Sequence, residues 1–143
     1  GLPVLYVVVR FRDGYPEVNS RNKGFSAIKA AGRLKEGSPG AQIHDRLTPR
    51  EDEPVIVKRR VSAFYNTELD SLLSARSVDT LILAGLATGG VILSTVRWAA
   101  DRDYAITVVA DACADPDDEV HRILTTKVLV RQANVVTTAD LLA

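Results

Sequence analysis

Short apolar runs that alternate with helix-like segments are the feature of this sequence that most constrains its fold. Runs rich in Val, Ile and Leu occupy residues 3–11, 54–58, 80–84 and 105–110, and a shorter run occupies residues 134–137. The first is nearly continuous, as is typical of a strand covered on both faces. Strands that alternate with helices form parallel sheets through right-handed crossovers. The pattern therefore predicts an α/β fold with a mostly parallel sheet.

Apolar residues at helical spacing mark the segments between these strands. Thr67 is expected to cap a helix with a buried face made of Leu69, Leu72 and Leu73. A second helix is expected to begin at Val91, after a glycine-rich turn, and a third to be capped by Asp115. A terminal helix is expected at residues 138–142. The stripe predicted to be buried in the third helix consists of Val120, Ile123, Leu124 and Val128.

The longest connection, residues 12–54, is polar and rich in Gly and Pro. It has room for one short helix, which we expect within residues 24–33. A loop of this length inside a compact domain usually has a function. We therefore expect it to act as a lid over a substrate pocket.

The composition excludes several classes of function. The 143 residues include 18 basic and 18 acidic side chains, so the net charge provides no attraction for nucleic acid or an anionic membrane. No apolar run approaches the roughly 20 residues that cross a bilayer. The single cysteine, Cys113, permits no intrachain disulfide and fits a reducing, cytoplasmic compartment. The length predicts one domain over residues 1–143.

Polar residues at the carboxyl ends of the strands are the candidate functional residues, because ligands of parallel sheets bind there. The segment Gly85–Gly90 runs from a strand into a helix, where unpaired amides can bind an anion or an oxyanion. A tight turn that needs glycine for steric reasons alone explains the same residues. The glycine spacing fits neither a phosphate loop nor a dinucleotide fingerprint, so a nucleotide-binding or redox Rossmann protein is not supported.

Lys58 ends an otherwise apolar strand. Partial desolvation makes the proton of such a lysine more available, so that it can act as an acid or an electrostatic anchor. A surface lysine at a strand end is the alternative. Phe64 and Tyr65 follow, and they either wall a small pocket or pack in the core. Arg59 and Arg60 are expected to be a solvated pair or partners of nearby acids.

Three stretches together resemble the isochorismatase-like hydrolase superfamily, which includes isochorismatases, nicotinamidases and N-carbamoyl amide hydrolases. They are VIVKRRVSAFYNTELDSLL, DTLILAGLATGGVILSTVRWAADRDY and ITVVADACAD. The resemblance implies a three-layer αβα sandwich of Rossmann-like topology, and an active site made of an aspartate, a lysine and a cysteine. Lys58 matches the lysine. The candidate substrate-binding residues are Phe64, Tyr65, Ala87, Thr88, Gly89, Gly90 and Val91.

Two departures from the family pattern bear on activity. In the family motif G-x-A-T-x-x-C, Val91 stands where the cysteine would be, and valine has no nucleophilic atom for a thioester. Cys113, at the end of a different strand, does not replace it, but isochorismatases proper also lack the cysteine and cleave a vinyl ether with acid–base help. The family's first strand, which carries the aspartate, has no counterpart. Its omission would leave unpaired sheet edges, so we expect that residues precede Gly1 in the natural protein or that a partner chain fills the gap.

The resemblance also bears on cofactors and on backbone geometry. Nicotinamidases hold a metal through an aspartate and two histidines that lie close together. His44 and His121 are far apart in this sequence and lie on unlike elements, which favours a solvated loop histidine and a helix-surface histidine. No metal or other cofactor is therefore expected. The family also implies a cis peptide bond near Ala87–Thr88.

The leading functional hypothesis is a hydrolase of a small carboxylate, amide or vinyl-ether metabolite that works without a cysteine nucleophile. It requires the ammonium group of Lys58 and unpaired amides of Gly89 and Gly90 to converge on a common hollow. The alternative is a catalytically inactive relative that binds a metabolite or scaffolds an oligomer. The expected partners are a small-molecule substrate and further copies of the same chain, in a homo-oligomer to which Trp98 or the long loop of residues 12–54 would contribute.

Overall fold

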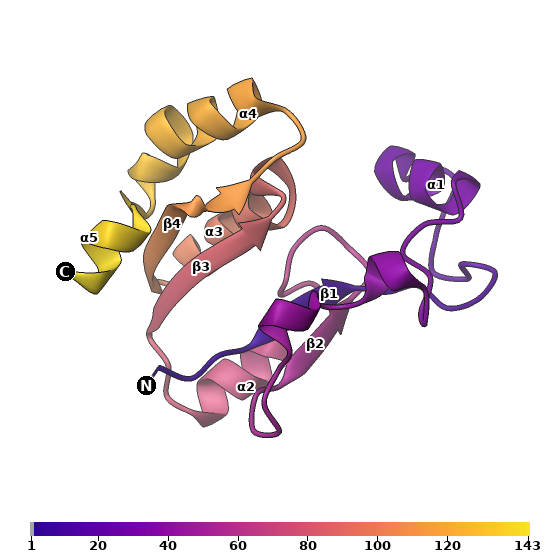
Figure 1. The fold of residues 1–143 in the computed structure, drawn as a ribbon, viewed down its shortest axis with the longest axis horizontal. Coiled ribbons are helices and arrows are strands. Elements are labelled where there is room, and N and C mark those ends of the chain that lie inside the picture. Colours follow the sequence, from indigo (N-terminus) through magenta and orange to yellow (C-terminus); the bar gives the residue numbers. More distant parts are fainter. Residues whose placement is uncertain (1) are drawn as a thin grey trace. The chain divides into compact units, whose positions relative to one another are not determined.

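The computed structural model describes residues 2–143, which form an α/β structure with parallel strands (Figure 1). It divides into two compact units, Gly1–Arg60 and Val61–Ala143. A sheet of β1 and β2 belongs to the first unit, and a sheet of β3, β4 and β5, in that order, belongs to the second. Every pair of neighbouring strands is parallel, which confirms the predicted fold class. The sequence predicted one sheet, whereas the hydrogen bonds of the described residues define two.

In the first unit, β1 (Tyr6–Val9) pairs with β2 (Val55–Lys58), and Val9 lies opposite Lys58. Strand β1 is shorter than the predicted run of residues 3–11. It ends early because Phe11 leaves this ladder: its amide donates to the carbonyl of Leu34 at 2.9 Å, and it forms an isolated bridge with Lys35.

The long connection of the first unit is more ordered than the sequence predicted. It contains α1 (Lys23–Ala30) and two short 3-10 helices, Pro39–Ala41 and Asp45–Leu47. Helix α1 begins where the side chain of its cap, Asn22, accepts from the amide of Phe25 at 3.1 Å. A buried aromatic cluster of Phe11, Tyr15 and Phe25 packs beneath this segment. The ring centroid of Phe11 lies 5.7 Å from that of Tyr15 and 5.4 Å from that of Phe25.

Strands β3 and β4 of the second unit are longer than predicted, and β5 is one residue shorter. Strand β3 spans Thr80–Leu86, β4 spans Ala105–Ala114 and β5 spans Asn134–Val136. The β3–β4 register shifts, because Leu83 lies opposite Val108 while Gly85 lies opposite Cys113. This irregularity lets both strands continue beyond the predicted ends. Gly85 has φ +124°, a conformation that L side chains rarely adopt, so glycine is required at this position.

Helices connect and cover these strands. They are α2 (Leu69–Ala75), α3 (Leu93–Ala100), α4 (Asp118–Ile123) and α5 (Thr138–Leu142), together with a π-helical turn at Thr88–Ile92, a second at Leu124–Val128 and a 3-10 turn at Leu129–Arg131. The terminal helix matches its predicted range. The core of this unit includes the almost fully buried side chains of Leu73, Val96, Ala99, Val108 and Leu129.

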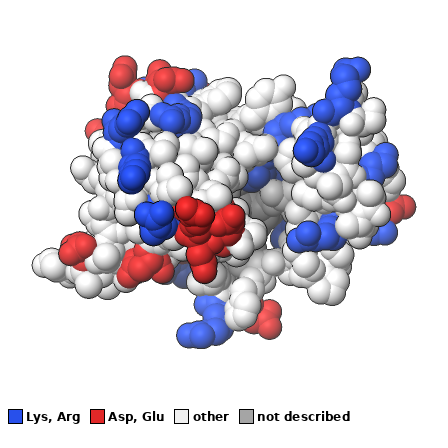
Figure 2. All heavy atoms as spheres, turned by 90° about the horizontal axis from the view of Figure 1, so that it is seen from above, with Lys and Arg blue, Asp and Glu red and all other residues white. Residues whose placement is uncertain are grey.

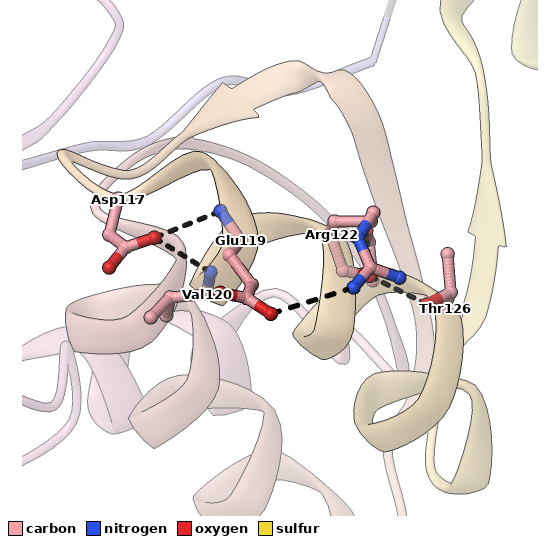
Figure 3. Close-up of polar contacts among 6 residues, drawn as sticks. Asp117, Glu119, Val120, Arg122 and Thr126 are labelled. Atoms are coloured by element: carbon pink, nitrogen blue, oxygen red, sulfur yellow. Dashed lines mark hydrogen bonds and ion pairs between the residues drawn. The ribbon is translucent and has the colours of Figure 1, made fainter.

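Helix α4 begins later than predicted, because its cap is Asp117 and not Asp115. The carboxylate of Asp117 accepts from the amides of Glu119 and Val120 at 2.9 and 3.2 Å (Figure 3). The predicted buried stripe of this helix is wrong in part. Leu124 is buried, but Val120 and Ile123 are each 37% exposed.

The surface of the described residues carries both signs of charge. Figure 2 shows acidic and basic side chains on the face that it draws, and neither sign covers that face alone. None of the helices formed by residues 2–143 has the length and apolar character needed to span a membrane.

Candidate active site

The predicted site residues are divided between the two units. Lys58 belongs to the first unit, and Phe64, Tyr65 and residues 87–91 belong to the second. The predicted convergence of Lys58 with the glycine-rich turn therefore stays a prediction, as does a strand preceding Gly1. Within each unit the local geometry is well defined.

Lys58 is buried at the carboxyl end of β2, with 5% of its surface exposed. The interpretation of Lys58 as a solvated surface lysine is therefore wrong. Its Nζ donates to the carbonyl oxygen of Arg60 at 2.8 Å. Burial disfavours the charged form and lowers the pKa of Lys58 from 10.5 to about 8. A lysine with such a pKa can hold or release a proton near neutral pH, which is a property of acid–base residues in active sites.

The amides of the glycine-rich turn are not bare. The amide of Gly89 donates to Oδ2 of Asp115 at 2.6 Å, and the amide of Gly90 donates to the carbonyl oxygen of Ala87 at 3.0 Å. The prediction of unpaired amides at these two glycines is wrong, because Asp115 reaches the turn instead of capping α4. The cis peptide bond implied by the resemblance is present, one bond earlier than expected, between Leu86 and Ala87.

Steric crowding gives Gly89 its main structural role. A Cβ atom at this position would lie 3.0 Å from Oδ2 of Asp115 and 3.2 Å from Cγ1 of Val120. Only a residue without a side chain lets the start of α4 approach the turn this closely. The steric interpretation of the glycines therefore holds for Gly89.

Thr88 links the turn to α4 through its side chain. It is completely buried, and its Oγ1 lies 2.8 Å from Nδ1 of His121. His121 is thus not a solvated helix-surface residue, as the sequence suggested, but a partner of the turn. Sequence reasoning missed this pair because nothing local joins two residues 33 positions apart. The full burial of the Thr88 hydroxyl argues for positioning of the turn and against nucleophilic attack.

The segment that contains Phe64 and Tyr65 is held beside α3. The amide of Ala63 donates to Oγ1 of Thr95, which lies four residues after Val91, at 3.2 Å. Phe64 is buried and stacks on Trp98 with a centroid separation of 6.1 Å. Phe64 therefore packs in the core of the second unit, as the alternative interpretation held. Tyr65, 51% exposed, is the residue of this pair that is free to contact a ligand.

Cys113 is a poor nucleophile in this environment. It is buried opposite Gly85, and burial raises the pKa of its thiol. Asp111, on the same strand, accepts from the amide of Thr138 at 2.7 Å and binds its hydroxyl, so it holds the start of α5. These contacts give the polar end of β4 a structural role.

The two histidines belong to different units. His44 is exposed in the first unit, where its Nδ1 accepts from the amide of Arg46 at 3.2 Å, and His121 lies in the second unit. Among residues 2–143, no three His, Cys, Asp or Glu side chains are grouped as metal ligands.

A cavity of about 410 Å³ lies at the other edge of the second unit's sheet. It adjoins the residues that precede β3 and β4, at the amino ends of these strands. Two of its lining residues, Arg102 and Asp70, form an ion pair, with Nη2 of the arginine 3.2 Å from Oδ2 of the aspartate. Parallel sheets bind their ligands at the opposite, carboxyl edge.

The parallel strands and the helices that connect them define an α/β protein, and sequence comparison names the family. The sequence matches the family described as Isochorismatase domain over residues 1–140. The chain therefore belongs to the isochorismatase family, which confirms the resemblance of its three motif stretches.

Individual relatives include both active and inactive proteins. The chain is 43% identical over 90 residues to a ureidoacrylate amidohydrolase of Methylobacterium radiotolerans, a match that covers 62% of this chain and 35% of that protein. It is 37% identical over 124 residues to an Arabidopsis thaliana protein named "Probable inactive nicotinamidase", covering 85% of this chain and 63% of that protein. The match thus spans about a third of the amidohydrolase and less than two thirds of the plant protein.

A solved structure agrees with the fold. The crystal structure of a cysteine hydrolase from Pseudomonas syringae pv. phaseolicola superposes with a TM-score of 0.86 at 28% sequence identity. The superposition covers 97% of this chain and 70% of that one. The superposition supports the α/β fold class.

Proposed function

We propose that this chain is the hydrolase domain of an enzyme that cleaves a small carboxylate, amide or vinyl-ether metabolite without a cysteine nucleophile. The observation that carries the proposal is the burial of Lys58, the last residue of β2, which lowers the pKa of its ammonium group to about 8. The amidohydrolase named among the relatives supports cleavage of an amide.

Lys58 supplies charge and a proton in this proposal. Water adds to the reacting carbon, the bond from that carbon to the leaving nitrogen or oxygen breaks, and Lys58 gives its proton to the leaving atom. The proton released by the water restores the ammonium group. Because its pKa lies near neutrality, Lys58 can complete both transfers at physiological pH.

Tyr65 and residues 87–91 are the proposed substrate-contacting residues of the second unit. Val91 stands at the motif position of the family nucleophile and would present an apolar surface in its place. Thr88, Gly89 and Gly90 hold the shape of the turn through the hydrogen bonds described above, and Tyr65 offers an exposed ring.

We also propose that the protein is cytoplasmic and forms a homo-oligomer. A single buried cysteine suits a reducing compartment such as the cytoplasm. Trp98, 38% exposed on α3, supports a homo-oligomer, because partly exposed tryptophans are enriched at interfaces.

A substrate panel tests the proposal. Ureido acids, simple amides and a vinyl-ether carboxylate are incubated with the wild type, with Lys58→Met and with a control, Lys29→Met, at an exposed lysine of α1. Methionine keeps the apolar stem but has no proton to donate. We expect Lys58→Met to lower kcat/KM for the accepted substrate by about 100-fold or more, and Lys29→Met to match the wild type. Equal rates for Lys58→Met and wild type would contradict a catalytic role for Lys58.

A catalytically inactive metabolite-binding protein is the second candidate. Val91 and the similarity to the plant protein named as an inactive nicotinamidase favour it. This candidate predicts that no compound of the panel is turned over, although compounds bind. The variant Val91→Cys adds a further test. If Val91 occupies the nucleophile position, the new thiol should be alkylated by iodoacetamide faster than the buried Cys113.

A further inference from the structure

Cationic side chains crowd the carboxyl ends of the two strands in the first unit. Because Val9 lies opposite Lys58 in the parallel register, the chain leaves both strands at the same level. Five cationic residues stand at these two ends: Arg10, Arg12, Lys58, Arg59 and Arg60. This is the edge at which α/β proteins bind ligands.

The carboxylate of Glu17 forms ion pairs with two of these cationic side chains. Its Oε1 forms ion pairs with Arg12 and, at 3.0 Å, with Nε of Arg59. The Arg59 contact is an ion pair without hydrogen-bond alignment. The Glu17 side chain is only 14% exposed, and its Oε2 is buried with no hydrogen-bond partner among the described residues. Glu17 therefore holds the two guanidinium groups from a largely buried position.

The other cations contact carbonyl groups, which leave their charge uncompensated. Nε of Arg10 donates to the carbonyl oxygen of Ala41 at 3.0 Å, and Lys58 donates to that of Arg60. The carboxylate that precedes Glu17 in the chain, Asp13, is paired with Lys35 at 3.0 Å. In this part of the first unit the repulsion among like charges therefore favours binding of an anion.

Arg59 has the best geometry for an anion. Its side chain is 26% exposed, compared with 60% for Arg12, so solvent screens its charge less. Within residues 2–143 the contacts of its guanidinium group involve only Nε, which leaves both terminal nitrogens for a ligand. Two neighbouring N–H groups of a guanidinium match the two oxygens of a carboxylate.

We propose that Arg59, held in place by Glu17, binds a carboxylate group of the substrate. The substrate class is then narrowed to amides or ethers that carry a free carboxylate. The assignment of this carboxylate to a substrate rests on the proposed function. The test below measures only the affinity of the chain for a carboxylate.

Titration of the full chain with succinate, and with succinamide as its uncharged counterpart, tests the proposal. Isothermal titration calorimetry compares the wild type, Arg59→Gln and a control, Arg33→Gln, at an exposed arginine of the same unit. We expect succinate to bind the wild type and the control at least about 10-fold more tightly than succinamide, and Arg59→Gln to lose this preference. Equal succinate affinity for wild type and Arg59→Gln overturns the proposal. Tighter binding of inorganic phosphate than of succinate by the wild type also overturns it.

Glu17→Gln separates positioning from simple charge. Removal of a negative charge by itself would strengthen binding of an anion, whereas release of Arg59 weakens it. We expect succinate to bind Glu17→Gln several-fold more weakly than wild type, with unchanged affinity for succinamide. Stronger succinate binding would show that Glu17 does not position Arg59.

Folding and turnover are controlled separately. Thermal melts followed by circular dichroism report whether each variant folds, and Arg59→Lys keeps the charge without the two-pronged geometry, so an intermediate affinity is expected. Loss of succinate binding in Arg59→Gln supports the inference even if no compound of the panel is hydrolysed. Hydrolysis accompanied by unchanged succinate binding overturns the inference and leaves the proposed function standing.

Discussion

The strand ends of the two units carry different kinds of polar group. At the ends of β1 and β2 these groups are charged side chains, and most of them contact carbonyl oxygens that leave their charge uncompensated. After β3 they are two backbone amides and the buried hydroxyl of Thr88, and each already has a partner within the second unit. The comparison teaches that the strand ends of the first unit keep uncompensated positive charge, whereas the polar groups after β3 in the second unit stabilise the local structure of the turn.

Gly89→Ala is expected to have the largest effect on stability. The new Cβ would lie 3.0 Å from Asp115 and 3.2 Å from Val120, so the start of α4 must shift. We expect a loss of about 1–3 kcal/mol in the free energy of unfolding, as for other overpacked sites. Urea denaturation followed by circular dichroism measures it.

Gly24→Ala is the matched control for this substitution. Gly24 lies in α1, and a Cβ there would meet nothing within 4 Å. Alanine should stabilise this helix by about 0.5–1 kcal/mol. If Gly89→Ala were as stable as Gly24→Ala, the shape of the turn would not depend on close contact with α4.

Thr88→Val tests whether the buried hydroxyl holds the turn. The substitution keeps the size of the side chain and removes the contact with Nδ1 of His121. We expect a loss of about 1–2 kcal/mol in unfolding free energy, because a partly buried imidazole nitrogen loses its partner. Thr88→Ser should retain most of the stability, and equal losses for valine and serine would point to packing and not to the hydrogen bond.

The pH dependence of stability tests the burial of Lys58, with a smaller expected effect. Its pKa is about 8 in the folded chain and 10.5 as the ordinary value, so between these pH values the unfolded chain binds more protons. The contribution of Lys58 to the free energy of unfolding should therefore rise as the pH increases from 8 to 10.5. Denaturation at a series of pH values, with Lys58→Met as reference, isolates this contribution from other groups. A constant difference between the two proteins across this range would contradict a buried, desolvated lysine.

The sequence predicted the secondary structure better than the contacts of the turn. Each predicted strand forms, because apolar runs and flanking Gly and Pro are local signals. Their ends were less predictable: β1 stops where Phe11 bonds to Leu34, and β3 and β4 extend through a register shift. Both changes depend on partners outside the predicted strands.

In the candidate site, too, features set by local sequence were predicted, and contacts with distant residues were not. Lys58 was predicted from its place at the end of an apolar run, and its burial agrees with that prediction. The interpretation of the glycines as bare anion-binding amides was wrong, because it considered the turn without the acid that reaches it. The ion pair of Arg59 with Glu17 agrees with the second of the two interpretations of this arginine, a solvated residue or a partner of a nearby acid, although the sequence did not name the acid.

The sequence by itself determined the α/β class, the order of the elements and the family, because each of these follows from residues close together in the chain. The structure decided that the lysine at the end of β2 is buried. Only the tertiary structure decided that Asp115 accepts a hydrogen bond from the amide of Gly89 and that the hydroxyl of Thr88 forms a hydrogen bond with His121. These contacts join residues 26 and 33 positions apart, and packing of α4 on the turn, which no local pattern encodes, brings them together.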